Sequence, residues 1–147
     1  MGFLDSLFGS STDSSKLTAQ ESFAGILLGA SACDGHIAEE EVQGLVTTLI
    51  RMELYRRFTD RQYNQMLNKL HGFLKRRGVD ELIDACVDSL PEQLDNAAFT
   101  NACDIVLADG VVEPDEKMFI DRLQQKLNIH PNKARMIVDV MVVKNRG

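Results

Sequence analysis

Residues 24–41, AGILLGASACDGHIAEEE, and residues 97–116, AAFTNACDIVLADGVVEPDE, carry the same pattern twice. Each stretch begins as a run of small and apolar residues, passes through an Asp-Gly pair and continues into an acidic segment. The pairs begin at Asp34 and Asp109, which lie 75 residues apart, about half the chain. Each acidic segment leads into another stretch of apolar periodicity. The pattern predicts two helical hairpins related by duplication.

The remainder of the chain from Thr18 onward also has helical periodicity, with no alternating strand pattern. Thr59 with Gln62 is typical of a capping box at a helix start, and Gly78 is expected to end that helix. Pro91, Pro114 and Pro131 are expected in first turns.

We therefore expect an all-α fold, a single-domain bundle of about seven helices built from two pseudo-repeated helical hairpins. The expected helices span residues 18–33, 39–54, 60–76, 80–90, 92–108, 114–127 and 131–144.

Length and cysteine usage limit the class of protein. A chain of 147 residues is one domain's worth and is long enough to bury a core without covalent staples. Cys33, Cys86 and Cys103 are an odd number with no CxxC spacing, which favours reduced thiols over a disulfide framework or a zinc site. There is no bilayer-length apolar run and no signal-peptide pattern, so we expect a cytoplasmic protein.

Charge is unevenly distributed along the chain. The net charge is −6, yet residues 51–77 carry eight basic and two acidic side chains, a local balance of +6. The overall acidity disfavours nucleic-acid binding. The basic segment is interpreted either as a solvated helix surface, which we favour, or as a surface that steers an anionic partner.

The N-terminal residues 1–17 are expected to be a flexible tail and Ser-rich linker, separate from the helical domain at residues 18–147. Within the tail, Phe3 with Leu7 and Leu4 with Phe8 stand at helical spacing. One apolar turn is not a stable helix alone. It is expected to be disordered, or to dock on the body of the protein, on a partner or weakly on a membrane surface.

Helix punctuation explains most of each acidic motif. With Ala38 and Glu113 as N-cap residues, the acids that follow lie in first turns, where the helix dipole favours negative charge. Glu41 and Glu116 are then placed to accept a hydrogen bond from the N–H of the cap residue. The glycines that follow Asp34 and Asp109 supply the left-handed residue that ends the preceding helix.

Asp34 and Asp109 are not explained in this way. Each is expected at the carboxyl end of a helix, where the dipole disfavours negative charge by about 0.3–1 kcal/mol. The helical wheel also places each near the edge of a buried face. A divalent cation or an arginine would compensate these carboxylates. The motif is no EF-hand, because its loop lacks alternating oxygen ligands before the glycine. Helix-turn structure, a metal site and a partner-facing acidic patch remain the three interpretations.

Enzymatic signatures are absent from the sequence. It contains no phosphate loop, dinucleotide fingerprint, HExxH motif or serine elbow. Paired carboxylates suit acid–base chemistry, but no nucleophile accompanies them. We expect a protein that is not an enzyme.

The two Asp-Gly turns, the segment from Ala102 to Leu127 and the closing residues 141–147 resemble the tellurite-resistance TerB-like family, over about residues 18–147. The resemblance implies an all-helical fold, found in bacteria alone or as a module of DjlA-type co-chaperones. It also implies a role in tellurite and other stress responses, as a metal-sensing or scaffolding unit partly at the inner face of the membrane. Ala38 and Cys33 depart from the usual first motif.

The resemblance further implies a divalent metal ion of unknown identity and at least one protein partner. The acidic residues implicated by motif position are Asp34, Glu40, Glu41, Asp109, Asp115 and Glu116. The alternative function is a metal-free protein-interaction scaffold, peripheral to the inner membrane through Phe3, Leu4, Leu7 and Phe8. The sequence does not indicate an oligomeric state.

Overall fold

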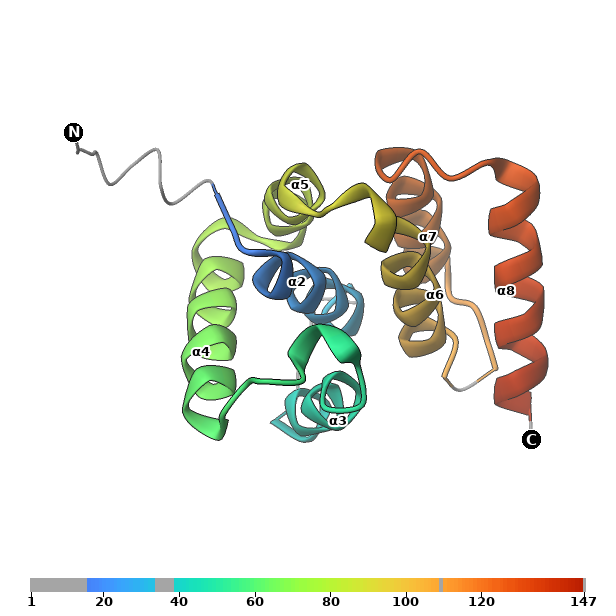
Figure 1. The fold of residues 1–147 in the computed structure, drawn as a ribbon. Helices are drawn as coiled ribbons and strands as arrows, with labels where there is room; N and C mark the ends of the chain where they lie inside the picture. Colours follow the sequence, from blue (N-terminus) through green and yellow to red (C-terminus); the bar gives the residue numbers. More distant parts are fainter. Residues whose placement is uncertain (1–15, 34–38, 109, 147) are drawn as a thin grey trace.

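The computed structural model describes residues 16–33, 39–108 and 110–146, with only the backbone of residues 39–41. Seven α-helices and two short 3₁₀ turns make up this part of the chain, which contains no strand (Figure 1). The α-helices are α2 (Ala19–Ser31), α3 (Glu39–Leu49), α4 (Asp60–Arg77), α5 (Val79–Ser89), α6 (Asp95–Val106), α7 (Pro114–Lys126) and α8 (Pro131–Arg146). The prediction of an all-α bundle is confirmed, whereas the internal repeat stays a prediction.

Local chemistry sets the helix ends. Thr59 and Gln62 form the expected capping box, with the Gln62 N–H donating to Thr59 Oγ1 at 3.2 Å and the Thr59 N–H donating to Gln62 Oε1 at 2.8 Å. Gly78 ends α4 at φ 88°, a left-handed backbone that side-chain-bearing residues rarely adopt. Pro114 and Pro131 are the first residues of α7 and α8, as predicted.

Two predicted helices are shorter than expected. The helix expected at residues 39–54 ends at Leu49, and a 3₁₀ turn, η1 (Glu53–Tyr55), follows. There the buried Tyr55 donates its hydroxyl to the Gln20 carbonyl at 2.7 Å, a tertiary contact that periodicity does not reveal. The helix expected at 92–108 begins with a second 3₁₀ turn, η2 (Glu92–Leu94), and ends at Val106.

Helix α2 lies at the centre of the bundle and contacts α3, α4, α5 and α6 (Figure 1). Every residue from Ser22 to Ala30 is buried. A helix buried in this way has neighbours on all sides, and they can approach closely only where its side chains are very small. A Cβ atom on Gly25 would overlap Cys86 Sγ of α5, and one on Gly29 would lie 2.7 Å from Ile83 Cδ1. These glycines therefore set the close spacing of α2 and α5.

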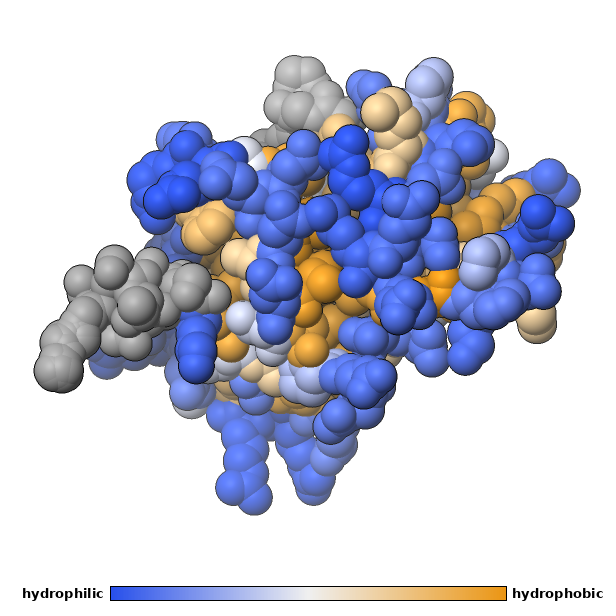
Figure 2. Space-filling view, turned by 90° about the horizontal axis from the view of Figure 1, so that it is seen from above, coloured by the Kyte–Doolittle hydropathy of each residue, from blue (hydrophilic) through white to orange (hydrophobic). Residues whose placement is uncertain are grey.

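The surface is mainly polar. Charged and polar side chains cover most of the face in Figure 2, and hydrophobic ones show between them. Ion pairs join neighbouring helices at the surface, including Lys69 with Glu21 at 3.0 Å and Lys144 with Asp104 at 3.0 Å. Such exposed pairs stabilise by at most about 1 kcal/mol each. No helix in the described part of the chain is long and apolar enough to cross a membrane.

The Gly25→Ala substitution is expected to lower the free energy of unfolding by about 1–3 kcal/mol, because the added methyl group overpacks the α2–α5 contact. Gly44→Ala is the matched control: it lies in α3 with open space around its Cβ position, so it should raise stability by about 0.5–1 kcal/mol through helix propensity. Urea unfolding followed by circular dichroism measures both.

A double-mutant cycle tests the cause of this loss. In the Gly25→Ala/Cys86→Ala variant the sulfur no longer opposes the new methyl group, so the two changes should cost less together than the sum of their separate effects. Strictly additive losses would contradict overpacking against Cys86.

Candidate functional site

The second acidic turn connects α6 to α7. After α6 the N–H of Gly110 donates to the Leu107 carbonyl at 3.0 Å, and Gly110 has φ 77°, the left-handed conformation expected for it. Glu113 is the N-cap of α7, and Glu116 Oε1 accepts the Glu113 N–H at 2.9 Å. The predicted role of Glu116 as a cap is confirmed, and one of its two carboxylate oxygens is thereby engaged.

The first acidic turn connects α2 to α3. Helix α2 ends at Ser31 and α6 at Val106, so Asp34 and Asp109 each stand three residues beyond a helix. Both aspartates lie outside the described residues, as do the side chains of Glu40 and Glu41. The helices predicted to reach residues 33 and 108 end two residues earlier, and the placement of each aspartate near the edge of a buried face stays a prediction.

A small cavity is lined by one described residue from each acidic region. It has a volume of about 170 Å³, and its lining includes Cys33, at the start of the first turn, and Asp115, in the first turn of α7. Val79 and Asp80 from α5 and Met118, Phe119 and Arg122 from α7 complete it. Asp115 is exposed. The residue before Asp34 therefore borders the same space as a predicted metal ligand of the second motif.

The guanidinium group of Arg122 already places a positive charge beside this cavity. Arg122 Nη1 donates to Asp80 Oδ1 at 2.5 Å, which joins α7 to α5. Among residues 16–33, 39–108 and 110–146, no three His, Cys, Asp or Glu side chains come together as a metal site. The described side chains alone therefore form no metal site, and a ligand set would have to include carboxylates outside them, such as those of Asp34, Glu40, Glu41 or Asp109.

The buried cysteines do not contribute to such a set. Burial in the apolar core, with a smaller effect from Glu21, raises the pKa of the Cys86 thiol to about 12. Burial, with a smaller effect from Asp104, likewise raises the pKa of Cys103 to about 12. Metals and electrophiles react with the thiolate, which is scarce at neutral pH for both residues. Both thiols are free and buried, as is consistent with the predicted absence of a disulfide framework.

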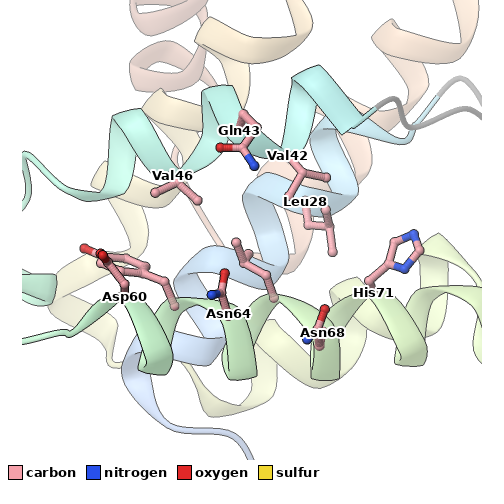
Figure 3. Close-up of a pocket in the computed structure, with 10 residues that line it drawn as sticks. Leu28, Val42, Gln43, Val46, Asp60, Asn64, Asn68 and His71 are labelled. Atoms are coloured by element: carbon pink, nitrogen blue, oxygen red, sulfur yellow. The ribbon is translucent and has the colours of Figure 1, made fainter.

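A larger groove lies between α3 and α4 and was not predicted. Its volume is about 720 Å³. Figure 3 shows Val42 and Val46 projecting from α3, Asn64 and His71 projecting from α4, and Leu28 of α2 between the two helices. The sequence does indicate that residues 63, 64, 67, 68 and 71 lie on one face of a helix, because they recur at helical spacing. The sequence could not show that α3 leaves this face of α4 open.

Comparison with protein families identifies the fold. A family model described as tellurite resistance protein TerB matches residues 20–138. The chain belongs to the TerB family. No curated protein and no solved structure matched it in the same comparisons.

The TerB match begins in α2 and ends in α8, so it includes both acidic turns and both lining helices of the α3–α4 groove. The predicted resemblance is thus confirmed over most of its extent. TerB is not a known enzyme family.

Removing the Glu116 carboxylate should weaken the start of α7. Glu116→Ala is expected to lower the free energy of unfolding by about 0.5–1.5 kcal/mol, because the Glu113 N–H loses its acceptor. Glu116→Gln keeps an acceptor oxygen and should stay within about 0.5 kcal/mol of the wild type. Chemical denaturation of the three proteins measures the difference, and equal losses in both variants would exclude capping as the role of this side chain.

Proposed function

We propose that this TerB-family chain is a non-enzymatic helical module whose paired acidic turns bind a divalent metal ion. In this proposal, binding of the ion connects the metal status of the cell, or a stress of the tellurite-resistance type, to a partner protein. Asp34 and Asp109 are the principal ligands, and Glu40, Glu41 and Asp115 add oxygens. Glu116 contributes the oxygen that its capping hydrogen bond leaves open. Hard cations suit this chemistry because they accept several carboxylate oxygens in flexible geometry.

One observation carries the proposal: Cys33 and Asp115 line one cavity. The first turn therefore begins beside the first turn of α7, although the two motifs are half the chain apart. Carboxylates that converge without a cation repel one another. Arg122 supplies one positive charge there but is already paired with Asp80. A divalent ion would supply the positive charge that compensates the remaining carboxylates.

Calorimetric titration with calcium, magnesium, manganese and zinc tests the metal site. Wild-type protein is expected to bind at least one of these ions at submillimolar concentration. The Asp34→Asn/Asp109→Asn variant should bind at least tenfold more weakly, because it loses both principal ligand charges while the side-chain volumes are kept.

The control variant is Asp139→Asn, which removes an exposed carboxylate from α8. It should bind the ion as the wild type does. Absence of binding at millimolar ion, or equal binding by the double variant, would refute the metal site.

The second candidate is a metal-free interaction scaffold that contacts an anionic surface, such as the inner face of a membrane. The exposed cations of residues 51–77 favour it. Arg51, Arg57, Arg61, Lys75 and Arg76 are all exposed and have no ion-pair partner among the described residues. Unpaired cations on one segment attract anionic headgroups by about 1 kcal/mol each near the surface.

Co-sedimentation with vesicles tests this second candidate. Binding to vesicles containing phosphatidylserine is expected to exceed binding to neutral vesicles and to fall as salt is raised, because the attraction is electrostatic. Arg57→Glu/Arg61→Glu should reduce it several-fold, whereas Lys117→Glu on α7 should not. Equal sedimentation with neutral and anionic vesicles would remove the membrane from the proposal.

A further inference from the structure

The α3–α4 groove has the construction of a helix-binding site. Val46 and Leu67 give it apolar walls, and Leu28 lies at its base. Polar side chains, Asn68 and His71 among them, line its α4 side (Figure 3). Amphipathic helices bind such grooves by placing residues spaced i and i+4 against the apolar surface. Among the described residues, none lines both this groove and the cavity beside Cys33 and Asp115.

We propose that this groove binds the N-terminal segment of the same chain, residues 3–8, as a short amphipathic helical turn. Phe3 with Leu7 and Leu4 with Phe8 give the segment an apolar stripe at i, i+4 spacing. A single helical turn forms too few hydrogen bonds to be stable alone, so the segment needs a surface that covers its apolar stripe. The groove supplies that surface.

A buried hydroxyl group in the groove lining has no partner among the described residues. Tyr63 lines the groove, is only 4% exposed, and its hydroxyl makes no hydrogen bond to any described residue. Buried polar groups in folded proteins are nearly always hydrogen-bonded. Burial and, to a smaller extent, Asp60 raise the pKa of Tyr63, so the hydroxyl keeps its proton and is a donor. The segment brings acceptors in its carbonyl groups and in the side chains of Asp5 and Ser6.

The point at which the N-terminal segment joins the body lies close to the groove. Leu17 is buried, and its N–H donates to Ser89 Oγ at 3.3 Å. Three residues later, the carbonyl of Gln20 accepts the hydroxyl of Tyr55, whose ring stacks on that of Tyr63 with centroids 6.0 Å apart. The start of α2 is thus connected through Tyr55 to Tyr63 of the groove lining.

The linker between this segment and the body is short. Residues 9–16 are eight residues rich in Ser, for which a flexible chain has an end-to-end distance of about 16 Å. A linker of that length gives an effective concentration of about 1 mM at a nearby site. Weak intramolecular docking is therefore sufficient to fill the groove.

Charge also favours this occupant. Residues 1–15 contain two side-chain carboxylates, on Asp5 and Asp13, and no basic side chain. Arg57 and Arg61, which have no ion-pair partner among the described residues, flank the start of α4 next to the groove-lining Asp60. An acidic segment is attracted to this end of the groove.

Paramagnetic relaxation in the full-length chain tests the proposal. A nitroxide attached through Ser6→Cys, in a Cys33→Ala background, should selectively broaden backbone amide signals of residues 42–46 and 63–71 and leave those of α8 unchanged. Buried Cys86 and Cys103 do not take the label while the protein is folded. The nitroxide-labelled chain is then mixed with an isotopically distinct chain that carries no nitroxide. Broadening confined to the labelled chain indicates docking within one chain, and broadening in the other chain indicates docking between two.

Two variants distinguish the groove from other docking surfaces. Tyr63→Phe, which removes only the unpaired hydroxyl, and Asn64→Arg, which places a bulky charge on the exposed groove side, should each reduce the broadening several-fold. The control Val140→Arg, on the exposed side of α8, should leave it unchanged. Uniform broadening, broadening centred on α8, equal broadening in the groove variants or broadening transferred to unlabelled chains would overturn the proposal.

Discussion

The close approach of α2 to α5 is the constraint on which the rest of the bundle depends. Helices usually pack about 8–10 Å apart, and the distance follows the side chains at the contact. Gly25 and Gly29 leave no side chain there, so Cys86 and Ile83 of α5 take the space. Because α2 is then covered on that side, its remaining faces bury Phe23, Ile26 and Leu27 completely against the other helices. A longer side chain at either glycine would displace α5 and loosen every layer around it.

The same packing positions the acidic cavity. Helix α5 begins at Val79, directly after the left-handed Gly78, and its first turn borders the cavity with the end of α2. The ion pairs of Asp80 with Arg122 and of Asp84 with Lys126 join α5 to α7 along one face. Each pair is exposed and stabilises little on its own. They lie along the contact of α5 with α7, and the same contact places the first turn of α7 near Cys33.

Most of the fold was predictable from the sequence because its helix signals are local. The capping box at Thr59, the left-handed Gly78 and the first-turn prolines each act within one turn of chain. The missed features are tertiary: η1 follows from the contact of Tyr55 with Gln20, and the groove follows from the separation of α3 from α4. The candidate site was predictable only as a pair of motifs. Arg122 and Asp80 are 42 residues apart, and no local pattern indicates that they meet.

Helix α3 is the element through which the two sites are connected. It begins at Glu39, directly after the first acidic turn, and Val42 and Val46 in its next turns form one wall of the groove. Helix α2 also lines the groove, through Leu28, but the burial of every residue from Ser22 to Ala30 leaves it little room to move. Coupling between distant sites requires an element that has two arrangements. If the proposed cation binds at the first acidic turn, α3 is therefore the element through which its binding would reach an occupant between α3 and α4.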